Sequence, residues 1–90
     1  MLENLSDIIG ILATVIGIIT SVGFYLQTFR IIRRKSSADV SVKAFSLFSI
    51  GIFTWFVYGI SLNNLPLIIS NIVALIGTLS VIITYFKYKK

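Results

Sequence analysis

The chain has no cysteine and no histidine among its 90 residues, and it has only three acidic residues. The lack of Cys and His excludes disulfides, thiolate chemistry and the usual zinc ligands. No nucleophile–base pair or metal-binding set is available, so we expect no metal, no cofactor and no enzymatic activity. Charge is missing over long stretches as well, because residues 8–29 and 44–86 include no Asp, Glu, Lys or Arg.

The two uncharged stretches hold 22 and 43 residues, and a polar segment at residues 61–66 interrupts the longer one. A helix needs about 20 apolar residues to cross a hydrocarbon core of about 30 Å, so the stretches hold one span and two spans. The hydrophobic content of 57% agrees with membrane spans. We predict an all-α membrane protein with a single domain, residues 1–90, and three transmembrane helices at about 5–29, 42–62 and 66–86.

Two residues mark helix starts. The hydroxyl of Ser41 can accept an N–H from the first turn of the second helix, and Pro66 suits the first turn of the third. No basic n-region or small-residue cleavage site precedes the first span, so we expect that span to be retained.

The basic residues predict the orientation. All eight Lys and Arg residues lie within residues 30–43 and 87–90. Short Lys/Arg-rich loops face the cytoplasm, so we place the C-terminus inside and the N-terminus, with Glu3 and Asp7, outside. A net charge of +5 could also suit nucleic acid. Basic clusters beside a span are orientation signals that also contact anionic lipid, so we expect membrane lipid and no nucleic acid as a partner.

A stripe of small residues follows one face of the first helix. Gly10, Thr14, Gly17 and Ser21 are spaced 4, 3 and 4. Such stripes let helices approach closely in lipid, so close packing is the expected role, and the lining of a polar path is the alternative.

Asn71 and Trp55 are unusual residues for lipid-facing positions within a span. Asn71 shares a small, polar face with Ala74 and Thr78, and Trp55 lies near the middle of its helix. At 1.5 Å per residue the two residues lie at about the same depth, roughly 9–10 Å from the outer surface. An amide that pairs with hydroxyls and an indole that covers C–H groups would hold a neutral polyhydroxylated ligand. The alternatives are an interhelical hydrogen bond for Asn71 and plain packing for Trp55.

The spans contain no Asp, Glu, His, Lys or Arg, which limits the transport chemistry. Proton relays and charged-substrate sites normally use such groups. A proton-driven pump or an exporter of cationic drugs is therefore not expected, and passive movement of a neutral solute fits better.

Several segments together resemble the SemiSWEETs, bacterial three-helix sugar transporters related to the SWEET and PQ-loop families. The segments are residues 24–27 (FYLQ), 39–41 (DVS), 55–60 (WFVYGI) and 65–71 (LPLIISN). The resemblance implies a parallel six-helix homodimer in the bacterial cytoplasmic (inner) membrane, with helix order 1-3-2 in each bundle. Three helices alone cannot enclose a sugar-sized path, which independently favours a dimer. The resemblance also implies that Trp55 and Asn71 bind the sugar, that Tyr58 is an extracellular gate, and that Gln27 lies near an intracellular hinge.

The chain departs from the family pattern at two places. Leu26 stands where the motif has a proline, so a bend in the first helix should be weaker or differently placed, and Gly23 could partly substitute for it. Charged residues that close the outer gate in some members correspond here to Leu62 and Asn64. Closure would then rely on the packing of Tyr58 and on neutral hydrogen bonds.

The sequence therefore predicts passive, facilitative transport of a mono- or disaccharide by alternating access at the interface of a homodimer. One alternative is a structural or assembly membrane protein without transport. Another is a PQ-loop-type carrier of a different small solute, such as an amino acid. The lack of an intramembrane carboxylate disfavours that carrier.

Overall fold

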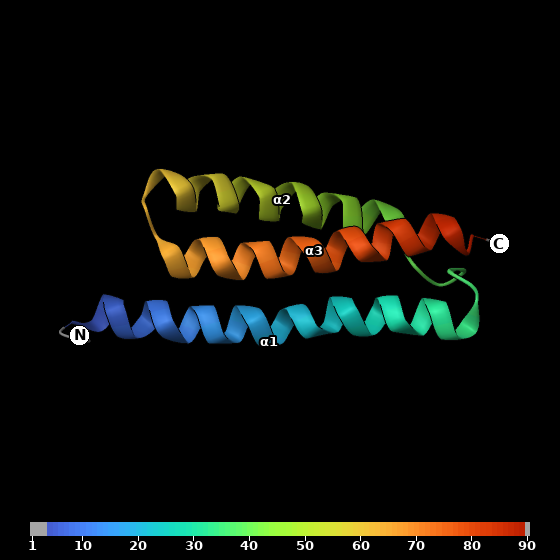
Figure 1. Ribbon diagram of the computed structural model, residues 1–90, viewed down its shortest axis with the longest axis horizontal. Coiled ribbons are helices and arrows are strands. Elements are labelled where there is room, and N and C mark those ends of the chain that lie inside the picture. Colours follow the sequence, from blue (N-terminus) through green and yellow to red (C-terminus); the bar gives the residue numbers. More distant parts are fainter. Residues whose placement is uncertain (1–3, 90) are drawn as a thin grey trace.

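The computed structural model describes residues 4–89, which form three helices (Figure 1): α1 (Leu5–Arg34), α2 (Val42–Ser61) and α3 (Leu65–Lys87). Each helix is long and apolar enough to cross a membrane, which confirms the predicted all-α fold with three spans. Glu3 and Lys90, which the charge pattern assigns to opposite sides of the membrane, lie outside the described residues.

The second helix begins directly after Ser41, as predicted, and the third begins at Leu65, one residue before the predicted start. The Ser41 hydroxyl accepts a hydrogen bond from the backbone N–H of Ala44 at 3.2 Å. The Asn64 side chain accepts from Leu67 at 3.1 Å, and Pro66 lies in the first turn of α3, where its missing N–H has no helical partner to lose.

The predicted end of the first helix was wrong. The helix does not end near residue 29 but continues to Arg34, beyond the uncharged stretch. Arg33 and Arg34 in the last turn interact favourably with the helix macrodipole, and Lys35 closes the helix in the left-handed region, with φ 54°. The prediction took the first charge as the helix end, although a helix can leave the hydrocarbon and continue into water. The bounds of α2 and α3 differ from the prediction by one residue or less.

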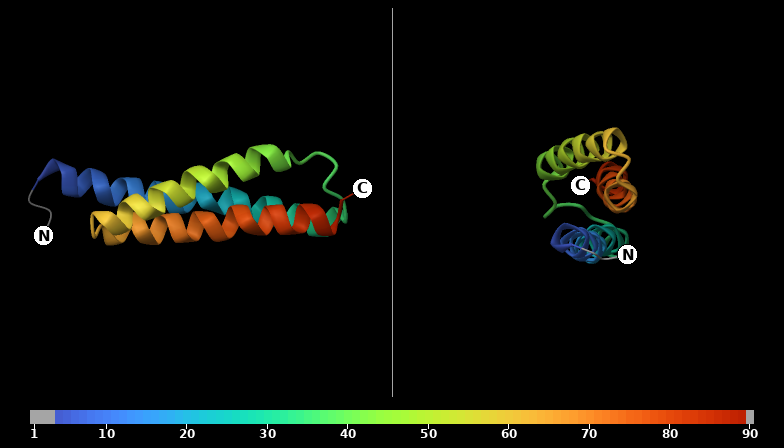
Figure 2. Two further views of the ribbon diagram at one scale, coloured as in Figure 1. Left: turned by 90° about the horizontal axis from the view of Figure 1, so that it is seen from above. Right: turned by 90° about the vertical axis from the view of Figure 1, so that its left-hand side faces the viewer.

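Helix α3 lies between the other two and packs against both (Figures 1 and 2), which confirms the order 1-3-2. In the most apolar 18-residue segment of each helix, 22% of the residues are buried in α3, against 6% in α1 and in α2. The difference arises because only the central helix has a neighbour on two sides. The N-terminus of α1 and the α2–α3 turn share one end of the bundle, here called the turn end. The α1–α2 loop and the C-terminal end of α3 share the other, here called the loop end.

Polar side chains join the helices at two points. Between α2 and α3, the Ser49 hydroxyl donates to the Thr78 hydroxyl at 2.9 Å, and both side chains are buried. Between α1 and α3, the Tyr25 hydroxyl donates to the backbone carbonyl of Val73 at 2.6 Å. Hydrogen bonds between membrane helices each contribute about 1 kcal/mol, so these two fix the helix pairing without dominating it.

The small-residue stripe on α1 packs as predicted over only part of its length. Ser21 is 1% exposed, and a Cβ on Gly17 would lie 3.8 Å from α3, whereas a Cβ on Gly10 would meet nothing within 4 Å. The closest approach comes from α3 instead, where a Cβ on Gly77 would lie 2.9 Å from the Cβ of Phe24. Helix α1 therefore lies tightly on α3 toward the loop end and separates from it toward the turn end.

Hydrogen bonds join the α1–α2 loop to the end of α3 and to the last turn of α1. Ser37 donates from its hydroxyl to the Tyr85 carbonyl at 2.9 Å and from its backbone to the Tyr88 carbonyl at 3.3 Å. The Arg34 guanidinium donates to the Asp39 carboxylate at 2.7 Å, and this hydrogen bond holds the pKa of Asp39 below its usual value. These contacts hold the basic loop against the end of the bundle.

A single copy buries little of its apolar surface. Among the described residues, the fully buried hydrophobic side chains are Ile31 and Val81, and most other large hydrophobic side chains are exposed. Such surface requires lipid or further protein around it.

Candidate functional site

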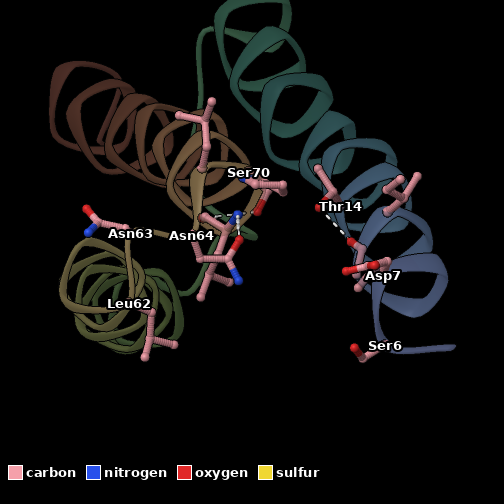
Figure 3. A pocket seen from close by; sticks show the side chains of 13 residues that line it. Ser6, Asp7, Thr14, Leu62, Asn63, Asn64 and Ser70 are labelled. Atoms are coloured by element: carbon pink, nitrogen blue, oxygen red, sulfur yellow. Dashed lines mark hydrogen bonds between the residues drawn. The ribbon is translucent and has the colours of Figure 1, made fainter. Parts of the chain in front are cut away.

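A cleft of about 910 Å³ opens at the turn end, between the first turns of α1 and the turn that joins α2 to α3 (Figure 3). Its polar lining residues are Ser6, Asp7, Thr14, Asn63, Asn64 and Ser70. The volume is sufficient for a small ligand.

The cleft forms because α1 diverges from α3 between Gly17 and the turn end. The Thr14 and Ser70 hydroxyls, on opposite walls, each donate to a carbonyl of their own helix. Their oxygens therefore keep acceptor capacity toward the cleft. On the turn side, Asn63 adopts a left-handed conformation, with φ 51°, which lets the chain reverse within a few residues.

Trp55 shares a face of α2 with Phe48, whose ring approaches α1, and with Leu62, which lines the cleft. Phe48, Trp55 and Leu62 are seven residues apart, so they share one helix face. The Phe48 ring lies 6.3 Å from the Phe24 ring of α1, and Leu62 lines the cleft. Trp55 itself is 57% exposed, and its ring packs edge-on against Tyr58 with centroids 5.7 Å apart. The indole therefore has an open face in a single copy.

Asn71 lies on the face of α3 that turns toward α2. It is seven residues from Thr78, the residue that bonds Ser49 of α2. Its Nδ2 donates to the Leu67 carbonyl of its own helix at 2.8 Å, and no residue that the structure describes donates to its Oδ1. Within one copy the amide thus makes no interhelical hydrogen bond and keeps one free acceptor.

Trp55 and Asn71 lie at one level of the bundle. A Cβ on Gly59 would lie 3.2 Å from Leu67, so these two residues face each other across the α2–α3 interface. Trp55 precedes Gly59 by four residues and Asn71 follows Leu67 by four, which places both about 6 Å farther from the turn. Neither residue lines the cleft, and no hydrogen bond or ring contact joins them among residues 4–89. Ser70, which does line the cleft, is the neighbour of Asn71 in the chain.

The predicted hinge residues lie in an unbroken helix. Helix α1 continues through Gly23, Leu26 and Gln27. A Cβ on Gly23 would meet nothing within 4 Å, Leu26 is exposed, and Gln27 is half-buried. The tight contact between Gly77 and Phe24 lies within the same stretch of α1.

Sequence reasoning missed the cleft and the contact between Tyr25 and Val73. Thr14 belongs to the predicted small-residue stripe, but no periodicity shows that α1 separates from α3 between Gly17 and the turn end. The tyrosine hydroxyl bonds a backbone carbonyl, which carries no residue-type signal at all.

Three helices that are long and apolar enough to cross a membrane, with no charged side chain between residues 8 and 29 or between 44 and 86, define a multi-pass membrane protein. The chain belongs to the family described as sugar efflux transporters for intercellular exchange, whose profile matches residues 7–90. Proteins of this family are transporters and not enzymes.

Individual relatives agree with the resemblance to SemiSWEETs. A sugar transporter SemiSWEET from Leptospira biflexa is 38% identical over 69 residues, which is 77% of this chain and 79% of that protein. One from Bradyrhizobium diazoefficiens is 26% identical over 77% of this chain and 80% of its own length. A crystal structure of a bacterial homologue of SWEET transporters superposes with a TM-score of 0.82 and 32% identity, covering 91% of this chain and 99% of that one.

Proposed function

We propose that this protein is a passive facilitator that carries a mono- or disaccharide across the membrane by alternating access. The observation that carries the proposal is the pair formed by Trp55 and Asn71, at one level within spans that hold no charged group. Membership in a sugar transporter family and the relatives named as sugar transporters support the substrate class.

The two side chains supply complementary parts of a sugar site. Asn71 has a free carbonyl oxygen that accepts a hydrogen bond from a sugar hydroxyl. The exposed face of Trp55 covers the C–H groups of the pyranose ring, excluding water without adding charge. Because the spans contain no Asp, Glu, His, Lys or Arg, the transport step would take no energy from a proton gradient, and flux would follow the sugar gradient.

A parallel homodimer would complete the path. One copy leaves the Trp55 indole and much of its apolar surface uncovered. A two-fold partner, the commonest oligomer symmetry, would bring a second Trp55 and a second Asn71 around a central axis. The sugar would then bind between the two copies.

The shape of the bundle suggests how the two sides open. A cleft at the turn end together with tight contact near Gly77 is the arrangement expected of a state open toward the turn end. The basic loop and the basic C-terminal segment favour a cytoplasmic loop end in the inner membrane, so that state would face outward. Closure of the outer side would bring the first turns of α1 onto the α2–α3 turn, with Tyr58 as the outer gate. The inner side would open through a movement of α1 near Gly23, Leu26 and Gln27.

Counterflow of radiolabelled glucose and sucrose into liposomes tests the transport. The wild-type protein should exchange one of these sugars without a proton gradient and in the presence of a proton ionophore. Asn71→Ala should lower the exchange about tenfold or more, since it removes a hydrogen bond to the substrate. Thr54→Ala is the matched control, because Thr54 lies at the depth of Trp55 but points about 100° away from it around α2, and its hydroxyl donates to the Ile50 carbonyl.

The other outcomes separate the alternatives. Exchange that survives Asn71→Ala would keep transport but exclude the proposed site. The absence of exchange by a folded protein for every sugar tried would favour a structural role or another neutral solute.

For the gate, Tyr58→Phe should retain exchange and Tyr58→Ala should slow it, because the ring rather than the hydroxyl packs on Trp55. Equal exchange rates for these two variants would contradict the proposed role of Tyr58 as the outer gate.

A further inference from the structure

A second cavity, of about 560 Å³, lies beside α1 at the loop end. It is lined by Leu26, Phe29, Arg30, Arg33 and Arg34. These positions recur every three or four residues, so they form one face of the helix, apolar toward the membrane centre and basic toward its end.

The positive charge in this cavity is only partly neutralised. Arg34 donates to the Asp39 carboxylate at 2.7 Å, and this is the salt bridge present within residues 4–89. Arg30 and Arg33 form no salt bridge there, and the pKa of Asp39 is lowered first by its hydrogen bond with Arg34 and last by the charge of Arg30. The Arg33 guanidinium instead lies over the Phe29 ring, 5.8 Å from its centroid, which orients it without cancelling its charge. Two guanidinium groups therefore remain available to an anion.

The order of side chains along the cavity matches one kind of anion. Leu26 and Phe29 are 56% and 57% exposed and lie at the end of the uncharged stretch of α1, whereas Arg30 and Arg33 belong to the basic segment that follows it. From Leu26 to Arg33 the helix rises about 10 Å, which is enough to pass from the hydrocarbon into a headgroup region about 5–8 Å deep. Guanidinium groups bind phosphate oxygens with two parallel hydrogen bonds, and the apolar residues offer contact to the chain.

We propose that this cavity binds one anionic phospholipid, with the phosphate of a lipid such as phosphatidylglycerol on Arg30 and Arg33 and an acyl chain against Leu26 and Phe29. The proposal requires a membrane-spanning chain but is independent of sugar transport. A second copy of the chain is a less suitable occupant. The nearest carboxylate, Asp39, is already paired, and a parallel copy would bring its own basic loop to the same level.

Native mass spectrometry of the delipidated protein in a neutral detergent tests this site, with phosphatidylglycerol and phosphatidylcholine titrated separately. The wild type should retain phosphatidylglycerol in preference to phosphatidylcholine. The double variant Arg30→Gln/Arg33→Gln should lose affinity for phosphatidylglycerol by about 25-fold, about fivefold for each arginine. The control Lys43→Gln/Lys89→Gln removes the same charge outside the cavity and should stay within about twofold of wild type. Because the side chains of Arg30, Arg33, Lys43 and Lys89 are all exposed, both double variants should unfold at the wild-type temperature in phosphatidylcholine.

Three results would overturn the proposal. Equal losses in the two double variants would mean diffuse attraction to charge and no site. Equal binding of soluble glycerol phosphate would mean that the phosphate alone is recognised and that the lipid chain contributes nothing. A change in oligomeric state in Arg30→Gln/Arg33→Gln, without lipid retention by the wild type, would make this face a contact between copies.

Discussion

At the scale of single residues, the polar side chains in the helices divide into two groups. Ser49, Thr78 and Tyr25 bond across helix interfaces, so packing alone accounts for them. Asn71 bonds only within its own helix and keeps a free oxygen. The sequence predicted Asn71 and Trp55 as unusual from their depth, but it left an interhelical bond open for Asn71. The hydrogen bonds made in the fold distinguish these cases, and residue type does not.

Gly77 of α3 is predicted to be the position at which the contact between α1 and α3 is least tolerant of change. An added Cβ would lie 2.9 Å from the Phe24 Cβ, and neither atom can rotate away because both are fixed to helix backbones. Gly77→Ala should therefore destabilise the protein by about 1–3 kcal/mol, measured as a lower unfolding temperature in detergent. Gly51→Ala is the control, since a Cβ there meets nothing within 4 Å. If Gly77→Ala were as stable as Gly51→Ala, the tight contact between α1 and α3 would be wrong.

At the scale of elements, the number of helices and the starts of α2 and α3 follow from the charge-free stretches and from their capping residues. The end of α1 did not follow, because apolar content reports where a helix leaves the hydrocarbon and not where its hydrogen bonds stop. The separation of α1 from α3 at the turn end could not be predicted either. It depends on which small residues meet a partner, and Gly17 meets one whereas Gly10 does not.

The unbroken course of α1 gives a prediction for its proposed hinge. Leu26→Pro would clash with a carbonyl one turn earlier and remove one helical hydrogen bond, which favours a bend. We expect it to change the populations of inward- and outward-open states, measured as distances between spin labels at helix ends. Leu26→Ala is the control, because it shortens the side chain and keeps the N–H. Distance distributions that are the same for Pro and Ala would show that bending at this position does not control the opening.

At the scale of the whole molecule, the order of helices agrees with the resemblance, and the pairing of copies remains our proposal. The exposed Trp55 and the small buried core are both explained if a second copy covers part of the surface. The detergent-solubilised protein should therefore have twice the 10.0 kDa mass of one chain, measured by native mass spectrometry. A strictly monomeric protein that still exchanges sugar in liposomes at very low protein density would contradict a path between two copies.

The central claim is that the sugar binds on Trp55 beside Asn71, and the chain offers a direct probe because Trp55 is its single tryptophan. The measurement is the quenching of Trp55 fluorescence by acrylamide while the transported sugar is added. A sugar that covers the indole should protect it from acrylamide in a saturable manner, and Asn71→Ala should weaken this protection about tenfold or more while Thr54→Ala leaves it unchanged. Quenching that stays the same at sugar concentrations that saturate transport would contradict the claim, because the sugar would then cross without covering Trp55.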